Sequence, residues 1–511
     1  MSITVKYSFK YFSLYLRNNF KSKVILILFL TVKNMNKKFI VLFWTALFIS
    51  QTLFGQYKLT LSNAVDTALT HNDKIKRYKA KVWEMGARKE ASFGNYLPKL
   101  SLYAGYTYFS ENMRFNTSTI KNSLDDILSR YGVQIANGVY PLPPEVDGKI
   151  YTALFNVFQQ FPAYDLVIDQ QQYPTAQLTL TQPLFTGGKI IAASDFSDTR
   201  YKSATYKLEM AKNEIIKETV TEYLGIALLK RVVAVREQVV AGINKHKRAA
   251  IKLYAEGIIP KYYLLRAEVA LSSAELELEE DRNKLELAEL ALKSTLGLPE
   301  DTTLVILDSL KFVDFNLPLD SALRKAEAGQ PILKIVDQLK EESELYKDLK
   351  QSKFLPDIFA YARYGFFLED KPMIMPPWIL GVEMRLNIFN GFKDYNDLEA
   401  AEYLTQQADF AKLEAEKKIK LWVNKTYRET DNAKNKYLKM KTTVDLASEN
   451  YRMVTKRFDQ GMATSLEVVD AILTYQGAKV KRLSALYDYY RALLELNIAV
   501  GAPMNVVNLY N

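Results

Sequence analysis

The sequence predicts a mixed α+β membrane protein, in which amphipathic strands contribute to a transmembrane β-barrel and very long helices continue it. Three observations favour this fold class. Segments of about ten residues alternate between apolar and polar side chains, as transmembrane strands do. Two nearly proline-free stretches are long enough for helices of about 100 Å. The whole pattern also occurs twice along the chain, which indicates an internal two-fold duplication.

The amino-terminal 55 residues are predicted to be a leader. Basic residues precede an apolar run at 39–49, and a milder stretch ends at Gly55, which is the three-part organisation of a secretory signal. We therefore expect a signal peptide at 35–55, and we interpret 1–34 as an over-called start or a long n-region. The alternative, a membrane anchor near 24–49, is interrupted by lysines and has no apolar piece of about 20 residues.

Most of the net positive charge of the chain comes from this leader. The chain has 68 Lys and Arg against 58 Asp and Glu, and eight of the basic residues lie in the first 55 positions. Without them 60 basic residues face 58 acidic ones, a net charge of +2. A nucleic-acid partner is therefore not expected. The absence of Cys excludes disulfides, thiolate catalysis and a lipid anchor on cysteine.

The two halves of the chain align in segments. Residues 97–109 match 355–367 without gaps at an offset of 258. Later segments match at an offset of 204, namely 184–189 with 388–393, 254–257 with 458–461, and 296–299 with 500–503. The difference of 54 places extra sequence in the first half, at about 110–174.

These matches define the domain organisation that we expect. The first structural repeat spans 56–299 and the second spans 319–503, with a linker at 300–318 and a short tail at 504–511. The first repeat has strands at about 97–109 and 175–186, a long loop at 110–174 and a helical hairpin at 190–297. The second has strands at about 355–367 and 378–389 and a helical hairpin at 393–501.

The strand at 378–389 shows the alternation best. Trp378, Leu380 and Val382 are apolar, whereas Gly381 and Glu383 lie between them. The pattern fits a barrel strand with lipid on one side and water on the other. An antiparallel sheet on a soluble core produces the same alternation, so this alternative stays open.

The long helices predict how each half ends. Apolar residues spaced alternately by three and four form a coiled-coil seam, with Tyr437, Met440, Val444, Ala447, Tyr451, Val454 and Phe458 on one run and Val480, Leu483, Tyr487, Tyr490 and Leu494 on the next. Gly257 and Gly461 mark the turns, so each half ends in an antiparallel helical hairpin. Four strands cannot close a barrel with an open lumen, and several chains must therefore contribute strands.

In these features the chain resembles the TolC-like outer-membrane factor (outer membrane efflux protein) family, from about residue 59 to residue 503. The segment 457–471 resembles the family's aromatic-x-x-Gly helical tip, and the Leu-Pro strand openings and Leu/Ile-Phe-x-Gly-x-Lys strand exits also fit. The resemblance implies a homotrimer with twelve strands in the outer membrane of a Gram-negative-type bacterium and a periplasmic helical tunnel.

The resemblance also implies a function. The chain would be the passive exit duct of a tripartite efflux or type I secretion system, in contact with outer-membrane lipid, a periplasmic adaptor protein and an inner-membrane pump. The competing interpretations are a periplasmic coiled-coil adaptor or scaffold, and an outer-membrane receptor that uses the long loop. We expect that loop to form an extracellular cap or partial plug.

Two acidic residues are implied to ring the periplasmic aperture. Glu467 and Asp470 hold the family positions just past the second tip, and their spacing of three places them on one helix face. The alternative is that they are ordinary solvated helix residues. Family members can lock this entrance with an Arg–Asp pair, but Ala463 and Tyr263 occupy those positions here. Arg266 is an alternative partner for the two acids.

The hairpin tips are implied to dock the adaptor protein, because an exposed turn with apolar residues can pack against another helical hairpin. The alternative is a pair of simple connecting loops. The candidate docking residues are Tyr254, Gly257, Ile258 and Pro260 at the first tip and Phe458, Gly461, Met462, Thr464 and Ser465 at the second.

We expect no enzymatic activity, cofactor or metal. The chain has no Gly-x-Ser-x-Gly elbow, no phosphate-binding glycine loop and no His-Glu-x-x-His motif. Its only histidines are His71 and His246, and we interpret both as surface residues on helices rather than as a catalytic pair.

Overall fold

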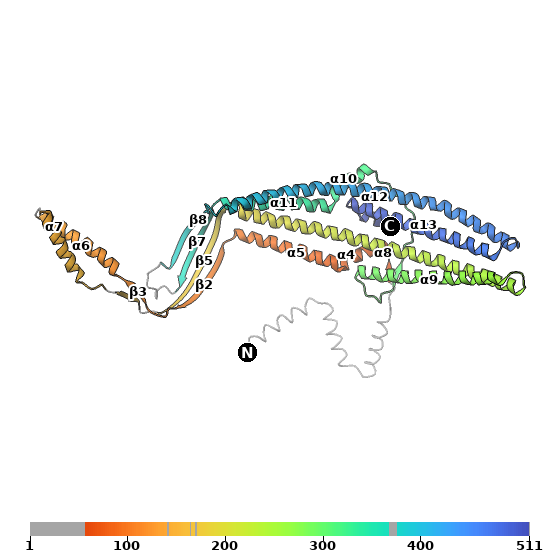
Figure 1. Cartoon of the computed structure of the whole chain (residues 1–511), viewed down its shortest axis with the longest axis horizontal. Helices are drawn as coiled ribbons and strands as arrows, with labels where there is room; N and C mark the ends of the chain where they lie inside the picture. Colours follow the sequence, from red (N-terminus) through yellow and green to blue (C-terminus); the bar gives the residue numbers. More distant parts are fainter. Residues whose placement is uncertain (1–56, 140–142, 164, 169–170, 367–375, 510–511) are drawn as a thin grey trace, which may run out of the picture. The chain divides into compact units, whose positions relative to one another are not determined.

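The computed structural model describes residues 57–139, 143–163, 165–168, 171–366 and 376–509 (Figure 1). The predicted signal peptide at 35–55 and the segment 1–34 lie outside these residues. The chain divides into two compact units. The strand unit consists of Lys81–Thr205 and Lys334–Glu414, and the helical unit consists of the remaining residues.

The strand unit contains the four antiparallel strands that the sequence predicts. They lie in the order β2 (Lys99–Tyr108), β5 (Gln172–Thr186), β7 (Asp357–Phe366) and β8 (Trp378–Arg385). Strand β8 ends at Arg385, earlier than the alternation suggested. Beyond it Asn390 accepts a hydrogen bond from the backbone N–H of Asp394 at 3.3 Å, so this part of the chain caps the following helix instead of extending the sheet.

The strand register brings the apolar side chains of all four strands onto one face. One row across the sheet consists of Leu102, Leu178, Tyr364 and Trp378, and the next row consists of Leu100, Leu180, Ala362 and Leu380. Polar residues such as Ser101, Thr179 and Arg363 share the other face.

No described part of the chain covers this apolar face. On β8 the side chains of Trp378, Leu380, Val382 and Met384 are each more than 60% exposed. A soluble sheet would bury such a face in a core. The structure therefore argues against the soluble-sheet alternative.

The segment between β2 and β5 differs from the predicted long loop. It contains β3 (Met113–Asn116), α6 (Ser118–Val139), α7 (Pro144–Gln159) and β4 (Asp165–Ile168), with β3 and β4 paired antiparallel. The extra sequence that the alignment offsets place here therefore forms regular elements. Pro144 is the first residue of α7, where its missing N–H costs no intrahelical hydrogen bond.

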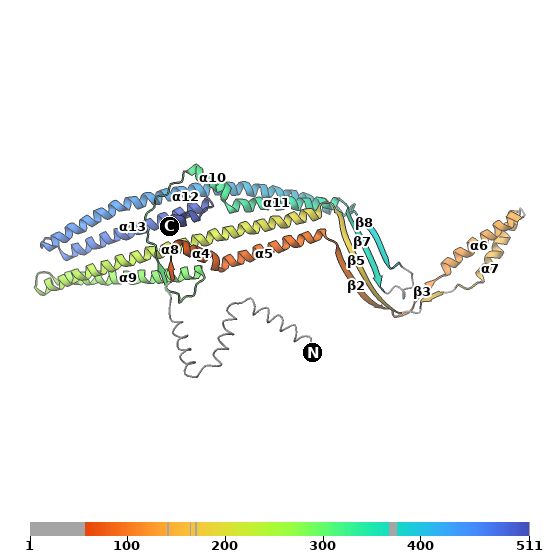
Figure 2. The ribbon, with the colours of Figure 1, turned by 180° about the vertical axis from the view of Figure 1, so that it is seen from behind.

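Eight helices form two similar sets. Each set begins with two shorter helices, α4 (Leu61–His71) and α5 (Asp73–Phe93), or α10 (Leu319–Gly329) and α11 (Pro331–Gln351). The long helices are α8 (Lys189–Ala255), α9 (Lys261–Leu296), α12 (Lys393–Asp459) and α13 (Ser465–Ala499). Both views show α8 beside α9 and α12 beside α13 (Figures 1 and 2). Within the described ranges, no helix is both long and apolar enough to cross a membrane.

The predicted coiled-coil seam corresponds to the more buried side of α12. All seven of its predicted residues are buried or half-buried, whereas neighbours such as Leu438 and Leu446 are exposed. Val444 and Ala447 pack against Ala478 and Tyr475 of α13. The three-and-four spacing thus identified the face of α12 that contacts its partner helix.

The core of the helical unit surrounds a short parallel pair, β1 (Tyr57–Leu59) and β6 (Leu304–Ile306). Tyr223 of α8 is fully buried, and its hydroxyl lies 2.9 Å from the Leu59 carbonyl oxygen and 2.8 Å from Asp308 Oδ2. Tyr490 donates to the Lys311 carbonyl at 2.8 Å, and Tyr489 to that of Val313 at 3.1 Å. The linker predicted at 300–318 is therefore held against the helices.

Candidate functional site

The two hairpin tips have the same backbone geometry. After α8, Gly257 has φ +73° and the N–H of Ile258 donates to the Leu253 carbonyl at 2.9 Å. After α12, Gly461 has φ +72° and the N–H of Met462 donates to the Arg457 carbonyl at 2.8 Å. This is the left-handed helix stop that glycine adopts at low cost, so both glycines have a structural role.

Most of the predicted docking residues are exposed at these tips. Ile258 and Met462 occupy the same position in the two turns and are 62% and 58% exposed. The side chain of Tyr254 is also exposed, as are Gly257, Pro260, Gly461 and Thr464. Each tip thus presents one large apolar side chain at its end.

Two of the predicted docking residues contact the first hairpin instead of solvent. Ser465 is buried and donates its hydroxyl to the His246 carbonyl at 3.3 Å. Phe458 is half-buried and makes an edge contact with the His246 ring, with the ring centres 5.4 Å apart. These residues join the two hairpins near their tips, and Ser465 is not part of the exposed surface.

His246 was expected to be a surface residue, and the structure shows that this expectation is wrong. Its side chain is 5% exposed, and its Nδ1 has no hydrogen-bond partner in the described chain. Burial lowers the pKa of His246, and the neighbouring Lys245 lowers it further. The seam spacing of α8 contains the signal that was missed, because Val239, Ile243, His246 and Ala250 follow steps of four, three and four and are all buried.

Glu467 and Asp470 both lie on the exposed side of α13. The side chains between and beside them are buried, and Val468, Val469 and Ile472 pack against Val239 and Ile243 of α8. The two carboxylates therefore share a face that points away from the contact between the hairpins.

Glu467 also stabilises the start of its own helix. Thr464 is the N-cap of α13, and the N–H of Glu467 donates to its hydroxyl oxygen at 3.2 Å. In return Glu467 Oε1 accepts from the N–H of Thr464 at 3.1 Å, which completes a capping box. The hydrogen bonds that the Glu467 carboxylate accepts from the backbone N–H and the hydroxyl of Thr464 lower its pKa, with a smaller effect from Arg457. Arg266 is not among the charges that act on it.

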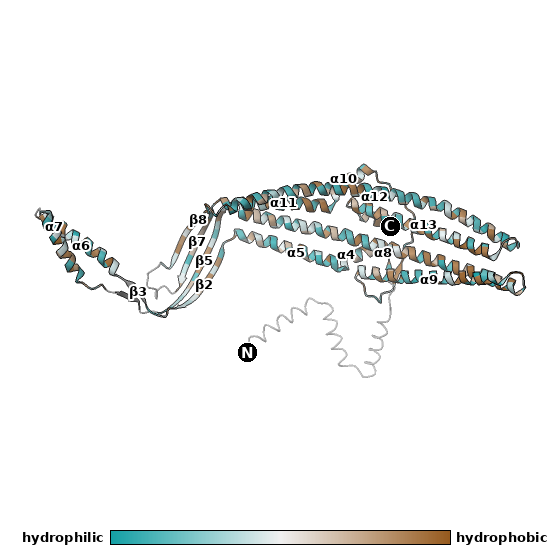
Figure 3. Ribbon diagram, in the orientation of Figure 1, coloured by the Kyte–Doolittle hydropathy of each residue, from teal (hydrophilic) through white to brown (hydrophobic). Residues whose placement is uncertain are grey.

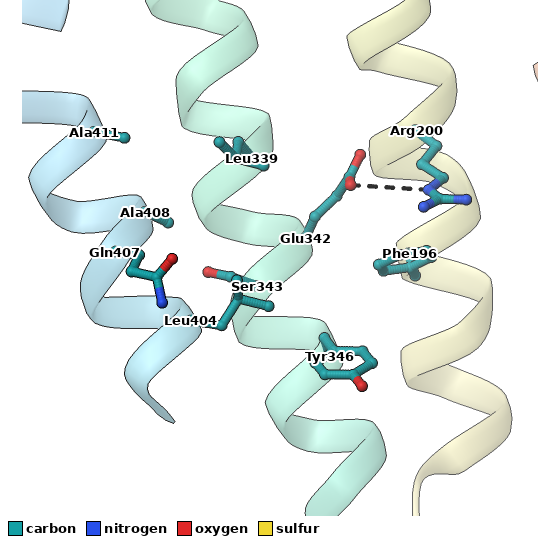
Figure 4. A pocket seen from close by; sticks show the side chains of 10 residues that line it. All are labelled: Phe196, Arg200, Leu339, Glu342, Ser343, Tyr346, Leu404, Gln407, Ala408 and Ala411. Atoms are coloured by element: carbon teal, nitrogen blue, oxygen red, sulfur yellow. Dashed lines mark ion pairs between the residues drawn. The ribbon is translucent and has the colours of Figure 1, made fainter. Parts of the chain in front are cut away.

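A cavity of about 460 Å³ lies in the strand unit between α8, α11 and α12 (Figure 4). Leu339, Leu404 and Ala408 supply apolar lining, and Arg200 Nε lies 3.8 Å from Glu342 Oε2. Ser343, also in the lining, donates its hydroxyl to the Lys340 carbonyl oxygen at 2.6 Å. Among the described residues, no group of three or more His, Cys, Asp or Glu side chains is arranged to hold a metal ion.

Residues 166–298 match the family model described as outer membrane efflux protein. This range covers the end of the inserted segment, β5, α8 and α9. No curated protein matches the chain.

Three solved structures illustrate the similarity of fold. The outer membrane protein VceC of Vibrio cholerae is 17% identical, with 86% of this chain and 96% of VceC covered and a TM-score of 0.68. The CmeC outer membrane channel of Campylobacter jejuni is 15% identical, with 87% and 86% covered and a TM-score of 0.67. The open state of the MtrE outer membrane channel of Neisseria gonorrhoeae is 15% identical, with 87% and 89% covered and a TM-score of 0.62.

Proposed function

We propose that the chain is a member of the outer membrane efflux protein family and serves as the outer-membrane channel of a tripartite efflux or type I secretion system. It acts as a passive exit duct, and a partner pump supplies the energy for transport. The observation that carries this proposal is the exposed apolar face shared by all four strands. A face of this kind is suited to lipid, and the polar face behind it is suited to a wet lumen.

The duct is a homotrimer. The four-stranded sheet ends at β2 on one side and β8 on the other, and each of these strands has only one neighbour in the described chain. Four strands are too few for an open barrel, whereas three copies supply twelve. Pairing of β2 with β8 of the next copy closes the sheet, and the long helices continue it as a periplasmic tunnel.

An internal duplication accounts for the two similar sets of elements. α4 and α10 have 11 residues each, α5 and α11 have 21, and β2 and β7 have 10. α8 and α12 have 67 residues each. The paired elements begin at the offsets of 258 and 204 that the sequence alignment predicts.

Glu467 and Asp470 form the periplasmic aperture. In a trimer six carboxylates converge, which attracts cations and makes the acids repel one another. This arrangement favours a hydrated constriction that opens easily. Because Glu467 also caps α13, a substitution that tests its charge has to preserve its capping hydrogen bonds.

The tips dock the periplasmic adaptor that connects the duct to an inner-membrane pump. The exposed apolar side chains Ile258 and Met462 supply the contact, together with Tyr254 and Pro260. A soluble adaptor or scaffold protein is the weaker alternative, because it would not need the exposed apolar sheet face.

The proposal is tested by the mass of the purified protein in detergent and by its conductance in a planar bilayer. We expect a trimer that inserts and conducts. A matched pair of variants tests the sheet faces, because Leu102 lies on the apolar face and Ser101 on the polar face of β2. Leu102→Lys should reduce insertion strongly, since a charge on the lipid face is costly, and Ser101→Lys should not.

A monomer that neither inserts nor conducts would overturn the proposal and favour the soluble scaffold. Equal insertion of the Leu102→Lys and Ser101→Lys variants would show that the apolar face does not meet lipid.

A further inference from the structure

The helical hairpin α6–α7 is inserted only in the first half of the chain, between two paired ladders. The β2–β5 ladder ends where Tyr108 lies opposite Gln172, the β3–β4 ladder follows, and the two helices come next. The opposite ends of β2 and β5 connect to α5 and α8. The hairpin therefore belongs to the end of the proposed barrel that is remote from the helical tunnel.

The face of α6 that contacts α7 is polar and small. Asp125 and Ser129 are buried there, and Gln159 Nε2 of α7 donates to Asp125 Oδ2 at 3.2 Å. Lys121 pairs with Asp125 and also donates to the Phe158 carbonyl at 3.1 Å. A Cβ at position 132 would collide with Leu154, so Gly132 permits the close approach of the two helices.

Seven of the eight large apolar residues of α6 lie on a different face, which nothing in the described chain covers, whereas Val133 is half-buried on the opposite side. These seven residues recur at helical spacing along the whole helix. Figure 3 shows apolar and polar residues mixed along α6. All seven are between 41% and 82% exposed, and they are Ile120, Leu124, Ile127, Leu128, Tyr131, Ile135 and Val139. We call this face the α6 stripe. An exposed apolar surface of this extent marks an interaction site.

We propose that the α6 stripe packs against the α6 stripes of two further copies of this chain, in a helical bundle around the three-fold axis. This inference rests on the proposed trimer. The bundle caps the outer end of the duct. It also buries side chains that would otherwise face water.

Continuity with the proposed subunit interface favours a second copy as the occupant. The stripe-bearing helix follows β2, the edge strand whose free side pairs with the next copy in the closed barrel. Each copy therefore contributes α6 from the strand that lies at the subunit boundary.

The charge pattern also favours identical partners. Around a three-fold axis the same side chains meet one another, so a charge on the contact face would be repelled by its own copies. The stripe contains no charged residue, and Ser123 and Gln134 flank one side of it. Arg130, the nearest exposed charge on that side, is paired with Asp126 at 3.0 Å.

The natural absence of cysteine makes disulfide cross-linking a direct test. Leu124→Cys introduces a thiol at the centre of the stripe, and Tyr131→Cys introduces one a heptad further along. Asn122→Cys, at an exposed position on the opposite side of α6, is the matched control. The full-length protein is oxidised mildly in outer membranes and separated on a non-reducing gel, and its mass in detergent is measured in parallel.

We expect Leu124→Cys and Tyr131→Cys to give a covalent dimer, with one chain of each trimer left unlinked, and Asn122→Cys to give almost none. An intact trimer in which neither stripe variant cross-links would overturn the bundle and leave the proposed function standing. Equal cross-linking of Asn122→Cys would also overturn it, as would an adduct of the Leu124→Cys variant with a different protein. Absence of a trimer in the unmodified protein would overturn both proposals.

Discussion

At the scale of single residues, Glu222 is the acid of the helical unit whose ionisation is most perturbed. Burial raises its pKa to about 7, the charge of Glu218 adds to this shift, and a hydrogen bond with Thr295 opposes it. Its Oε2 has no hydrogen-bond partner in the described chain. The carboxyl group is therefore close to its titration midpoint at neutral pH.

This perturbation predicts a pH dependence of stability. Between pH 4.5 and 7 the unfolded chain has released the Glu222 proton and the folded chain still holds it, so the free energy of unfolding falls as the pH rises through this window. Glu222→Gln cannot ionise and should melt at a higher temperature than the natural protein at pH 8, with little difference at pH 4.5. Thermal unfolding at both pH values checks this.

The exposed residue Glu218, one turn away, is the matched control. Glu218→Gln should leave most of the pH dependence in place. If Glu222→Gln shifted the melting temperature equally at both pH values, the titration of this group would not be the cause.

The sequence predicted residue roles only where they depend on neighbouring positions. The Thr464-x-x-Glu467 spacing contains the capping box, so this role of Glu467 was accessible from sequence. The burial of Ser465 was not, because its partner is the carbonyl of His246, which is 219 residues away in the chain. The position of Glu467 and Asp470 at an aperture depends on further copies and stays a prediction.

At the scale of elements, strong periodicity decided which features were predictable. The four strands and the long helices followed from repeats of two and of three and four residues. The short strands β1 and β6 were missed because three residues do not establish a period. α6 and α7 were missed because the extra 54 residues of the first half were interpreted as a loop. Pro144 is compatible with a helix there, since proline is tolerated at the first helical position.

The exposed apolar side chains at the hairpin tips predict which substitutions weaken adaptor docking. Met462 is an exposed apolar residue at the end of the second tip, and Met453 is similarly exposed on α12, two turns before that helix ends. Met462→Asp places a charge in the proposed contact and should reduce adaptor binding at least tenfold, whereas Met453→Asp should change it little. In-cell cross-linking with co-expressed adaptor and pump measures this.

Both variants keep the turn glycine, so a failure of folding would appear as a loss of protein from the membrane. Undiminished cross-linking of Met462→Asp would place the docking surface elsewhere. An equal loss of cross-linking in both variants would indicate that the docking surface extends along α12.

At the scale of the whole molecule, the proposed duplication and the proposed trimer together account for the architecture. In such a trimer, three chains of two similar halves would arrange six related units around one axis. The insertion of α6–α7 between β2 and β5, in only one half, breaks this similarity. The proposed trimer would therefore contain three α6–α7 hairpins but six hairpins of long helices.

The proposed aperture would form only in a trimer, so its test is a measurement on the assembled protein. Glu467→Gln combined with Asp470→Asn removes six negative charges from the trimer and keeps an oxygen that can accept the capping hydrogen bond from Thr464. The reversal potential in a salt gradient across a planar bilayer should show reduced cation preference, because the field of converging carboxylates concentrates cations at the narrowest point. Glu429→Gln with Asp445→Asn removes the same charge from exposed positions of α12 outside the tip, and should change selectivity little. Equal shifts from the two double variants would indicate that overall tunnel charge sets selectivity, and an unchanged potential in the first would remove Glu467 and Asp470 from the constriction.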